Sequence, residues 1–465
     1  MKLEDLKVRL KHVPSLDQGF MPFKAYKDAY EKSVAINGGK DIAIAIGRNK
    51  SQVAVYRLKV HKEAGFMEMD QAYLDRFIKF LLWMKGGYKV YICGDMTLAN
   101  KMKNVYSSKG SRAFDVAFME RVYENDFEVI GLGLDGCPEA NEVGTYVAGD
   151  LSGSRIGFDA GGSDMKICAV EDGKVLYSEE IVWHPKLQKD PDYHYKHIRS
   201  TIKKAATYLS QVDAIGISSA GVYVENRCMV ASLFILIEGD DFDHKMKDIY
   251  VEITKDYPEA QVSVLNDGDV AAVAGSMEIE DTNVIGIAMG TSEAVGFIDG
   301  QGMVKGWLNE LAFAPVDFNE EAMVDEWSGD YGCGVKYFSQ DGVIKLARRS
   351  GIEFHEGSSP AEKLKDVQKL MMAEDKRAIE VYTNIGIYLG HTLAFYYEMY
   401  EMSHVLLLGR VMSGKGGNLI IELANRVLDQ EYSEIADKLS LHLPDEKSRR
   451  TGQSVAAASI PDLSS

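Results

Sequence analysis

The sequence lacks the features of membrane, secreted and nucleic-acid-binding proteins. No apolar run reaches the roughly 18 residues of a membrane-spanning helix. The first residues, MKLEDLKVRLKHVP, contain no apolar signal core. Positive charge is in deficit, because the formal net charge is −18, and nucleic acids are bound through basic patches. We therefore expect a cytoplasmic protein that binds neither membrane nor nucleic acid.

Cysteine is scarce and unpaired. The five cysteines, at positions 93, 137, 168, 228 and 333, are widely spaced and form no C-x-x-C pair. This pattern predicts mostly buried thiols in a reducing compartment. Cys333 stands between two glycines in YGCGVKYF, residues 331–338, a pattern often found in metal knuckles. No second cysteine lies near it, so the partners that a tetrahedral zinc site needs are missing.

The two common nucleotide-binding motifs, G-x-x-x-x-G-K-[ST] and G-x-G-x-x-G, are also absent. Three other glycine loops each follow an apolar strand: DAGGS at 159–163, GTS at 290–292, and Gly409 with SGKGG at 413–417. Glycine allows backbone N–H groups to approach phosphate oxygens closely. A hairpin turn explains any one loop alone, but three loops in order favour phosphate binding.

Two acidic positions follow apolar strands. Asp159 directly precedes Gly-Gly, where a carboxylate can lie near a nucleotide's Mg²⁺, usually through water; an Asx turn also explains it. Asn266 and Asp267 enter a helix of small residues. Such a pair can bind a sugar hydroxyl and take its proton, and it can also cap the helix. The two roles are compatible.

The 465 residues suffice for two to four domains. Residues 1–150 alternate strand and helix patterns and predict a small α/β or α+β unit, ending in the polar segment GDLSGSR at 149–155. Residues 153–465 continue with strands and intervening helices, which is typical of α/β proteins. The hairpins at 45–60 and 159–175 are similar, with Ala45 standing where Asp159 does. Either an internal repeat or chance accounts for the similarity of the two hairpins.

The order of these motifs resembles the ROK family of sugar kinases in the actin/hexokinase superfamily. DAGGS resembles the family's first phosphate motif, LNDGDVAAVAG its Asn-Asp signature, MGTSEAVGFIDG its second phosphate motif, and LLLGRVMSGKG its adenosine-side motif. The resemblance covers residues 153–465. It implies two actin/hexokinase-like (ribonuclease-H-like) α/β lobes around a cleft. Lobe 1 would be about 153–270 plus the C-terminal helix, and lobe 2 about 271–445.

The resemblance implies ATP-dependent phosphorylation of a sugar hydroxyl, in a hexose or hexosamine, with Mg²⁺. Asp267 matches the general base, and Asp159 matches the aspartate that faces Mg²⁺, through water. The positions that match nucleotide contacts are Asp159, Gly161, Gly162, Ser163, Gly290, Thr291 and Gly409. Those that match sugar contacts are Gly221, Asn266, Glu310, Phe313 and Gln340. Dimers are common in the family, so a homodimer is an open option.

The departures from the family lie mainly on the sugar side. Phe313 stands where the family has a histidine that binds sugar and zinc, and Tyr331 and Phe338 replace two zinc cysteines. We therefore predict no zinc site and expect these aromatic residues to pack as a cluster. Gln340 replaces a sugar-binding glutamate.

Two charged residues are unusual beside the phosphate loops. Glu293 adds an acid to the second loop, either pointing away or weakening nucleotide binding. Lys166 is either a cation near the first loop or a solvated strand residue.

Three functions fit the sequence. The first is a sugar kinase, favoured by the retention of Asp159 and Asp267. The second is a non-catalytic sugar- or nucleotide-sensing protein with the same fold, motivated by Phe313, Gln340 and Glu293. The third is a kinase with a non-sugar acceptor.

Overall fold

The computed structural model describes residues 1–147, 149–444 and 448–463, without the side chains of 448–451. The chain forms two compact units. Unit 1 consists of Met1–Val143, Ile287–Ala294 and Trp307–Leu443; unit 2 consists of Gly144–Gly286, Val295–Gly306 and Pro444–Ser465. Both units mix helices and strands, as the sequence predicts.

Unit 2 is built on a five-stranded sheet with the order β12-β9-β6-β7-β8. The strands are β6 (Ser154–Ala160), β7 (Asp164–Glu171), β8 (Lys174–Val182), β9 (Ala214–Ser219) and β12 (Gln261–Asn266). β6, β9 and β12 are parallel, whereas β7 and β8 run antiparallel to their neighbours. The carboxyl ends of the three parallel strands therefore share one edge of the sheet.

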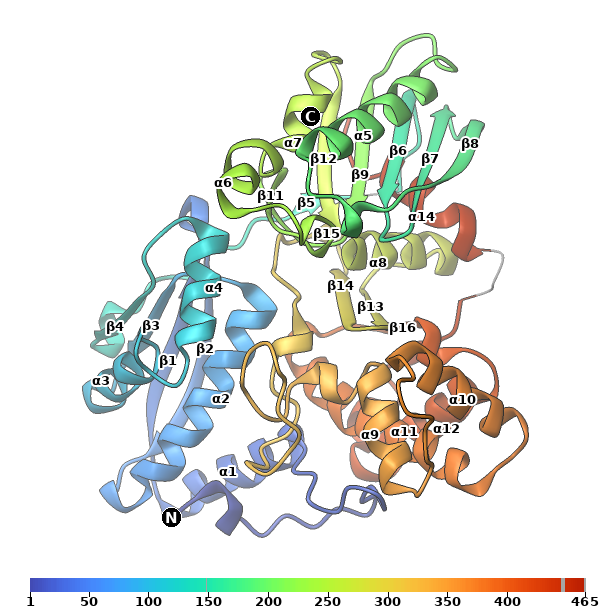
Figure 1. The fold of residues 1–465 in the computed structure, drawn as a ribbon. Helices are drawn as coiled ribbons and strands as arrows, with labels where there is room; N and C mark the ends of the chain where they lie inside the picture. The colour runs from blue at the N-terminus through green and yellow to red at the C-terminus, as the bar shows by residue number, and fades with distance from the viewer. Residues whose placement is uncertain (148, 445–447, 464–465) are drawn as a thin grey trace. The chain divides into compact units, whose positions relative to one another are not determined.

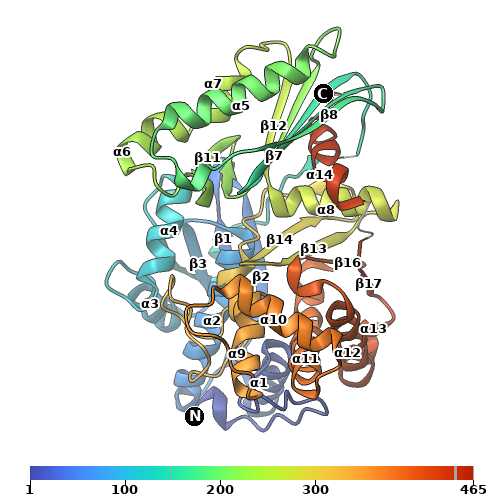
Figure 2. The same ribbon diagram turned by 45° about the vertical axis from the view of Figure 1, so that its right-hand side comes forward.

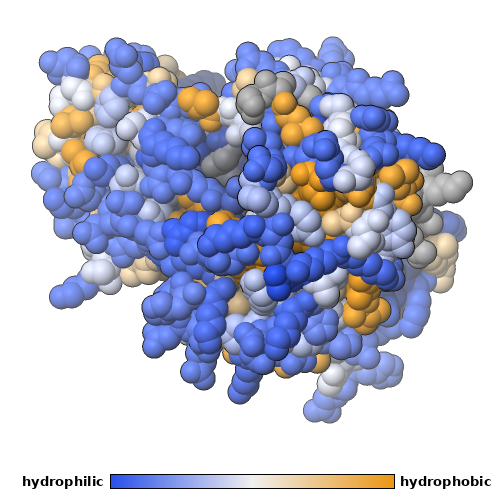
Figure 3. Space-filling model, turned by 90° about the horizontal axis from the view of Figure 1, so that it is seen from above, coloured by the Kyte–Doolittle hydropathy of each residue, from blue (hydrophilic) through white to orange (hydrophobic). Residues whose placement is uncertain are grey.

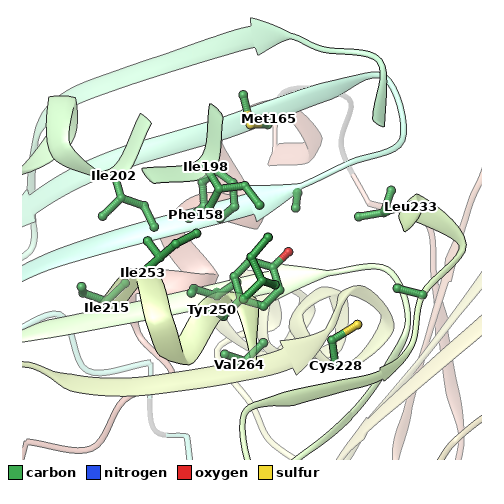
Figure 4. Packing of buried hydrophobic residues seen from close by; sticks show 14 of the residues in the cluster. Phe158, Met165, Ile198, Ile202, Ile215, Cys228, Leu233, Tyr250, Ile253 and Val264 are labelled. Atoms are coloured by element: carbon green, nitrogen blue, oxygen red, sulfur yellow. The ribbon is translucent and has the colours of Figure 1, made fainter. Parts of the chain in front are cut away.

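Helices cover both faces of this sheet. α5 (Pro191–Ala206) and α7 (Ile249–Thr254) lie on one face, and α14 (Ser448–Ala458) lies on the other (Figure 1). Alternate residues of β6 point to opposite faces. Phe158 packs with Ile198 and Ile253 in the core under α5 and α7 (Figure 4). Gly157 faces α14 on the opposite side.

The remaining elements of unit 2 are short except for α8 (Asp267–Ile279), which packs against α14. They are β5 (Thr145–Tyr146), β10 (Val222–Val224), β11 (Arg227–Val230), α6 (Gly239–Asp241) and β15 (Met303–Val304). β5 pairs with β15, and β10 pairs with β11. A second apolar core joins α8 to α14 through small residues such as Ala272 and Ala456.

Unit 1 begins with a four-stranded sheet of order β2-β1-β3-β4. Its elements are α1 (Phe23–Asn37), β1 (Gly39–Gly47), β2 (Val53–His61), α2 (Met67–Lys85), β3 (Lys89–Cys93), α3 (Met96–Val105), α4 (Ala113–Tyr123) and β4 (Glu128–Leu132). β3 runs antiparallel to β1, whereas β9 runs parallel to β6. The similarity between the hairpins β1-β2 and β6-β7 therefore does not extend to the next strand of each sheet.

The rest of unit 1 is mainly helical, and its helices lie beside one another in Figure 2. They are α9 (Gln340–Arg349), α10 (Pro360–Met372), α11 (Lys376–Tyr400), α12 (Lys415–Glu431) and α13 (Ser433–Ala436). A second four-stranded sheet has the order β14-β13-β16-β17, formed by β13 (Val284–Met289), β14 (Glu293–Ile298), β16 (His404–Leu408) and β17 (Ser440–His442). Of β13 and β14, only residues 287–289 and 293–294 belong to unit 1. α11 is central: Phe395 stacks on Phe23 with ring centroids 4.0 Å apart. The N-terminal residues thus share a core with α11.

The surface view in Figure 3 shows where hydrophilic and hydrophobic residues lie on one face of the molecule. The face shown in Figure 3 is mostly hydrophilic, with hydrophobic residues in separate spots. Isolated exposed apolar side chains are normal on globular proteins and indicate no membrane contact by themselves. In the described part of the chain, no helix combines the length and apolarity needed to cross a membrane.

Candidate active site

Asp159 lies at the edge of the unit 2 sheet where the parallel strands end. The strand register places it opposite Ser218 of β9, and the Ser218 hydroxyl donates a 2.6 Å hydrogen bond to Asp159 Oδ1. Asp159 is buried. Burial raises the pKa of its carboxyl, while the Ser218 hydrogen bond and the Lys166 charge act in the opposite direction.

Lys166 of β7 is directly opposite Asp159 in the sheet register. Its Nζ lies 3.7 Å from Asp159 Oδ2 and 3.1 Å from Asp164 Oδ1. Of the two alternatives for this lysine, the structure supports a cation beside the first glycine loop rather than a solvated strand residue.

The first glycine loop connects β6 to β7. Gly161 N donates to Asp164 O at 2.9 Å, and the Trp183 indole donates to Gly161 O at 2.8 Å. A Cβ at Gly162 would meet only the end of Lys186, 3.6 Å from its Nζ. Ser163 Oγ bonds to Asp164. The loop is therefore open beside Gly162, next to a positive charge, which suits a phosphate group.

Asn266 and Asp267 end β12 and begin α8. Asn266 Oδ1 accepts from Gly268 N at 2.7 Å, so Asn266 is the helix N-cap. Its Nδ2 donates to Gly221 O at 2.5 Å. Gly221 has φ +139°, and a Cβ there would lie 2.3 Å from Val230 O. A glycine is therefore required at position 221 to bring this carbonyl to Asn266.

Asp267 is electrostatically coupled to Asp159. Burial raises the pKa of Asp267 to about 6, and the negative charge of Asp159 adds to this shift. Gln453 donates to Asp267 O at 2.9 Å and to Ser218 Oγ at 3.4 Å. Because Ser218 also bonds Asp159, a continuous set of hydrogen bonds holds the two acidic residues in one region of unit 2.

The second glycine loop and Gly409 lie in unit 1. A Cβ at Gly290 would have one neighbour, Ser292 O at 3.6 Å, so the space beside it is open. Arg410 Nη2 donates to Thr291 Oγ1 at 2.9 Å. Gly409 has φ +91°, and a Cβ there would lie 2.3 Å from Met289 O. Gly409 thus permits the close approach of β16 to β13.

Glu293 points into unit 1 instead of out of the loop. Its side chain is buried, with a relative exposure of 3%, and it lies against Gly334. Neither carboxyl oxygen has a hydrogen-bond partner in the described part of the chain. Burial raises the pKa of Glu293 to about 8, with a contribution from Glu310. At neutral pH this carboxyl is therefore protonated and brings no negative charge to the loop.

Two acceptor-side residues of unit 1, Glu310 and Gln340, are held by backbone hydrogen bonds. Glu310 N donates to Trp83 O at 2.9 Å. Gln340 is the first residue of α9, and its backbone N donates to Gly290 O at 2.9 Å. The side-chain Oε1 of Gln340 is buried and lacks a hydrogen-bond partner within the described residues. An amide oxygen in this state is available for a hydroxyl donor.

The expected aromatic cluster takes another form, because the three replacements contact different partners. Phe313 lies 4.6 Å from the Trp83 ring, with Phe114, Phe118 and Trp327 around it. Tyr331 lies under the Arg76 guanidinium, 4.3 Å from its ring centroid. Phe338 is 6.4 Å from Tyr337. Apart from Trp327, these partners of Phe313 and Tyr331 come from N-terminal helices. Those helices lie outside residues 153–465, so the family resemblance gave no sign of them.

The structure thus collects the site residues inferred from the sequence into two sets. Unit 2 holds Asp159, Gly161, Gly162, Ser163, Gly221, Asn266 and Asp267; unit 1 holds Gly290, Thr291, Glu310, Phe313, Gln340 and Gly409. Ser218, Lys186 and Gln453 were not identified from the sequence. Strand register indicates Ser218, but no local pattern marks Lys186 or Gln453.

Cys333 is a buried thiol. Burial raises its pKa to about 11, which disfavours the thiolate that a metal requires. Among the described residues no group of three or more His, Cys, Asp or Glu is arranged to hold a metal ion. Asp159 carries a carboxylate that can hold Mg²⁺, whose other ligands are commonly water and phosphate.

The chain matches the sequence model of one protein family. A model described as the ROK family matches residues 155–440, more than half of the chain. The chain belongs to the ROK family. No curated protein matches it. Residues before 155 lie outside the family match, which agrees with the predicted N-terminal extension.

Solved structures of ROK proteins share the fold. The ROK hexokinase from Thermus thermophilus is 15% identical, with a TM-score of 0.53 over 67% of this chain and 98% of the hexokinase. A ROK transcriptional regulator, a homologue of the E. coli MLC protein, is 18% identical, with a TM-score of 0.51 over 67% of this chain and 79% of the regulator. The predicted hexokinase-like α/β fold is confirmed. The same fold serves an enzyme and a regulator, so the function must be argued from the site.

Proposed function

We propose that this ROK protein is an ATP-dependent sugar kinase that phosphorylates a hydroxyl of a hexose or hexosamine. The observation that carries the proposal is the hydrogen-bond chain through Ser218 and Gln453 that links Asp159 to the backbone of Asp267 in the unit with an open glycine loop. Residues 153–465 would carry the activity, with about 153–270 and the C-terminal helix as one lobe and about 271–445 as the other.

Asp267 is the proposed general base. A sugar hydroxyl must lose its proton as it attacks the phosphoryl group, and a nearby carboxylate can accept that proton. With a pKa of about 6, Asp267 is ionised at neutral pH and still basic enough for this role. Asn266 caps α8 and thereby holds Asp267 at the helix start.

Backbone N–H groups at the glycine loops and the charge of Lys186 would hold the phosphates. Gly162 and Gly290 leave open space for close approach, and Lys186 supplies charge next to Gly162. Asp159 would hold Mg²⁺ through water. The bound metal would neutralise charge that develops on the transferred phosphoryl group. Lys166 would have to share Asp159 with that metal, because the two residues form an ion pair.

Glu310 and Gln340 are the proposed acceptor ligands. Gln340 offers an unpartnered, buried Oε1, and leaving such a group without a partner costs free energy that a hydroxyl donor can recover. Phe313, which is half-buried, would supply a ring to an apolar face of the sugar. Gly221 helps to orient Asn266.

A coupled ATP-consumption assay over hexoses, hexosamines and polyols tests the proposal. We expect at least one sugar to stimulate ATP use, and the same sugar to fail with Asp267→Asn while binding nearly unchanged. Sugar binding without stimulated ATP use by the parent protein would contradict the kinase assignment.

That result would favour a non-catalytic sugar or nucleotide sensor. The observation on its side is the Lys166–Asp159 ion pair, which occupies the carboxylate proposed to face Mg²⁺. Isothermal titration with ATP in the presence and absence of Mg²⁺ separates the two. Metal-independent nucleotide binding supports the sensor.

A further inference from the structure

Residues 325–333, here called the acidic loop, have little regular structure of their own. Their backbone bonds include Asp325 N to Asp330 O at 2.8 Å and Gly329 N to Asp325 O at 2.8 Å. The loop leads directly to the short helix Gly334–Lys336 and to α9, which begins at Gln340. Loops are more mobile than the elements they connect, so contacts from other elements restrict the conformations of this one.

Three cations from the N-terminal helices converge on one carboxylate oxygen of this loop. Asp330 Oδ2 lies 2.7 Å from Arg76 Nη1, 2.8 Å from Lys79 Nζ and 2.8 Å from Arg112 Nη1. Arg76 and Lys79 lie on α2, and Arg112 directly precedes α4. Lys79 is fully buried and Asp330 is 8% exposed. Solvent therefore screens these attractions little.

Arg76 also binds the backbone of the loop. Its Nη2 donates to Tyr331 O at 2.8 Å and to Asp317 O at 3.2 Å. Its guanidinium covers the Tyr331 ring. A planar guanidinium can satisfy several acceptors at fixed angles, which a lysine cannot do.

The cluster is balanced by two further carboxylates. Asp75 accepts from Arg112 at 2.9 and 2.6 Å, and Asp115 lies 3.4 Å from Lys79. Burial alone would raise the pKa of Asp330, but Arg76, Lys79 and Arg112 together lower it well below its ordinary value. Removing one member leaves a buried charge uncompensated, which is strongly destabilising.

Backbone hydrogen bonds link the acidic loop to the acceptor-side residue Phe313. The backbone after Tyr331 pairs with the segment that follows Phe313: Val316 N donates to Gly332 O, and Gly334 N donates to Ala314 O, both at 2.9 Å. Phe313 in turn packs on Trp83 of α2. Movement of the acidic loop would therefore displace both Phe313 and the start of α9.

We propose that Arg76, Lys79 and Arg112 are positioning residues for the acceptor side, acting through Asp330 on Phe313 and Gln340. The N-terminal segment is thereby an internal support of the sugar-binding half of the protein. The kinetic part of this inference rests on the proposed kinase function, but the structural part does not.

Asp330→Asn in the full chain is the test, with Lys79→Met as a second variant. We expect the KM for the sugar to rise about tenfold or more, since small displacements of binding groups have effects of this order. The KM for ATP should stay within about twofold. Hydrogen–deuterium exchange should quicken at 330–340 and stay unchanged at 159–164. Asp256→Asn is the matched control, because Asp256 pairs with Arg199 and Lys203 on the surface of unit 2.

Unchanged exchange at 330–340 in both variants would overturn the inference. An equal decrease of kcat with both KM values unchanged would overturn it as well, since that result reflects only a smaller folded fraction. If no sugar stimulates the parent protein, the proposed function fails, and the exchange data still decide whether the cluster holds the loop.

Discussion

The carboxyl groups of Asp267, which is half-buried, and Glu293, which is buried, differ in protonation although burial acts on both. Burial raises the pKa of Asp267 to about 6 and that of Glu293 to about 8. Asp267 also receives stabilising contacts from backbone N–H groups and Lys186, whereas Glu293 has no such compensation. At neutral pH one is therefore a base and the other a neutral acid.

The first prediction at this scale concerns the pH dependence of catalysis. Only ionised Asp267 can accept a proton, so kcat/KM should rise as pH increases through about 6 and then level off. Asp267→Asn should lose about a thousandfold in kcat without this pH dependence. Initial rates between pH 5 and pH 8 measure both effects, and retained turnover in the variant would exclude Asp267 as the base.

The second prediction concerns stability. The unfolded chain releases the Glu293 proton near the ordinary value of 4.5, whereas the folded chain keeps it to about 8. Between these values the folded state binds more protons, so Glu293 lowers stability as pH rises. Glu293→Gln should remove this loss and gain up to about 4 kcal/mol relative to the parent between pH 4.5 and pH 8. Urea unfolding measures it.

A matched variant makes this test specific. Glu434→Gln removes an exposed glutamate and should leave the pH dependence of stability as in the parent. An identical pH dependence for Glu293→Gln and the parent would show that the Glu293 carboxyl is ionised in the folded protein.

At the scale of elements, α14 lies directly on the backbone of the unit 2 sheet. A Cβ at Gly157 of β6 would lie 1.8 Å from Ser454 O, and a Cβ at Gly216 of β9 would lie 1.7 Å from Ala457 O. Two glycines on neighbouring strands thus let the helix approach closely. This approach brings Gln453 within hydrogen-bonding distance of Asp267 O.

Gly216→Ala should therefore push α14 away from the sheet. We expect a loss of about 1 to 3 kcal/mol in the free energy of unfolding, the usual range for overpacking. kcat should fall as well, because the Gln453 bond to Asp267 O is strained. Gly239→Ala is the control, since a Cβ there meets nothing within 4 Å. Equal stability of the two variants would mean that α14 moves freely.

Sequence patterns predicted the elements whose neighbours are close in the chain. The hairpin β6-β7, the strands β9 and β12 and the long helix α11 were all visible, because each combines a clear hydrophobic pattern with glycine or polar ends. The glycine loops were visible for the same reason. The direction of β3 was not, since pairing with β1 depends on tertiary packing.

The contacts of the acidic loop could not be predicted either. Arg76 and Asp330 are 254 positions apart, and the sequence around each one indicates only an ordinary surface charge. Only the fold reveals that both are buried. For Glu293 the sequence provided part of the answer. Its place in the second glycine loop was evident, but the direction of its side chain depends on the space beside Gly334.

At the scale of the whole molecule, unit 1 is assembled from three separate stretches of chain. The N-terminal residues cover α11 with buried contacts. Phe80 lies 4.6 Å from the Phe395 ring, and Leu16 N donates to Asn384 Oδ1 at 2.9 Å. Burial of large aromatic rings contributes strongly to stability, so this N-terminal segment is part of the core of unit 1.

The last prediction follows from this shared core. A chain starting at Gly144 would expose the α11 face that Phe23, Phe80 and Leu16 cover, together with the unpaired charge of Asp330. We expect such a fragment to aggregate or bind the dye ANS, and to lose the cooperative urea unfolding of unit 1. Co-expression of residues 1–143 should restore a soluble complex, because the missing contacts are non-covalent. If the fragment alone is soluble and unfolds as cooperatively as the full chain, the N-terminal segment is an independent addition to the ROK fold and not a support of its core.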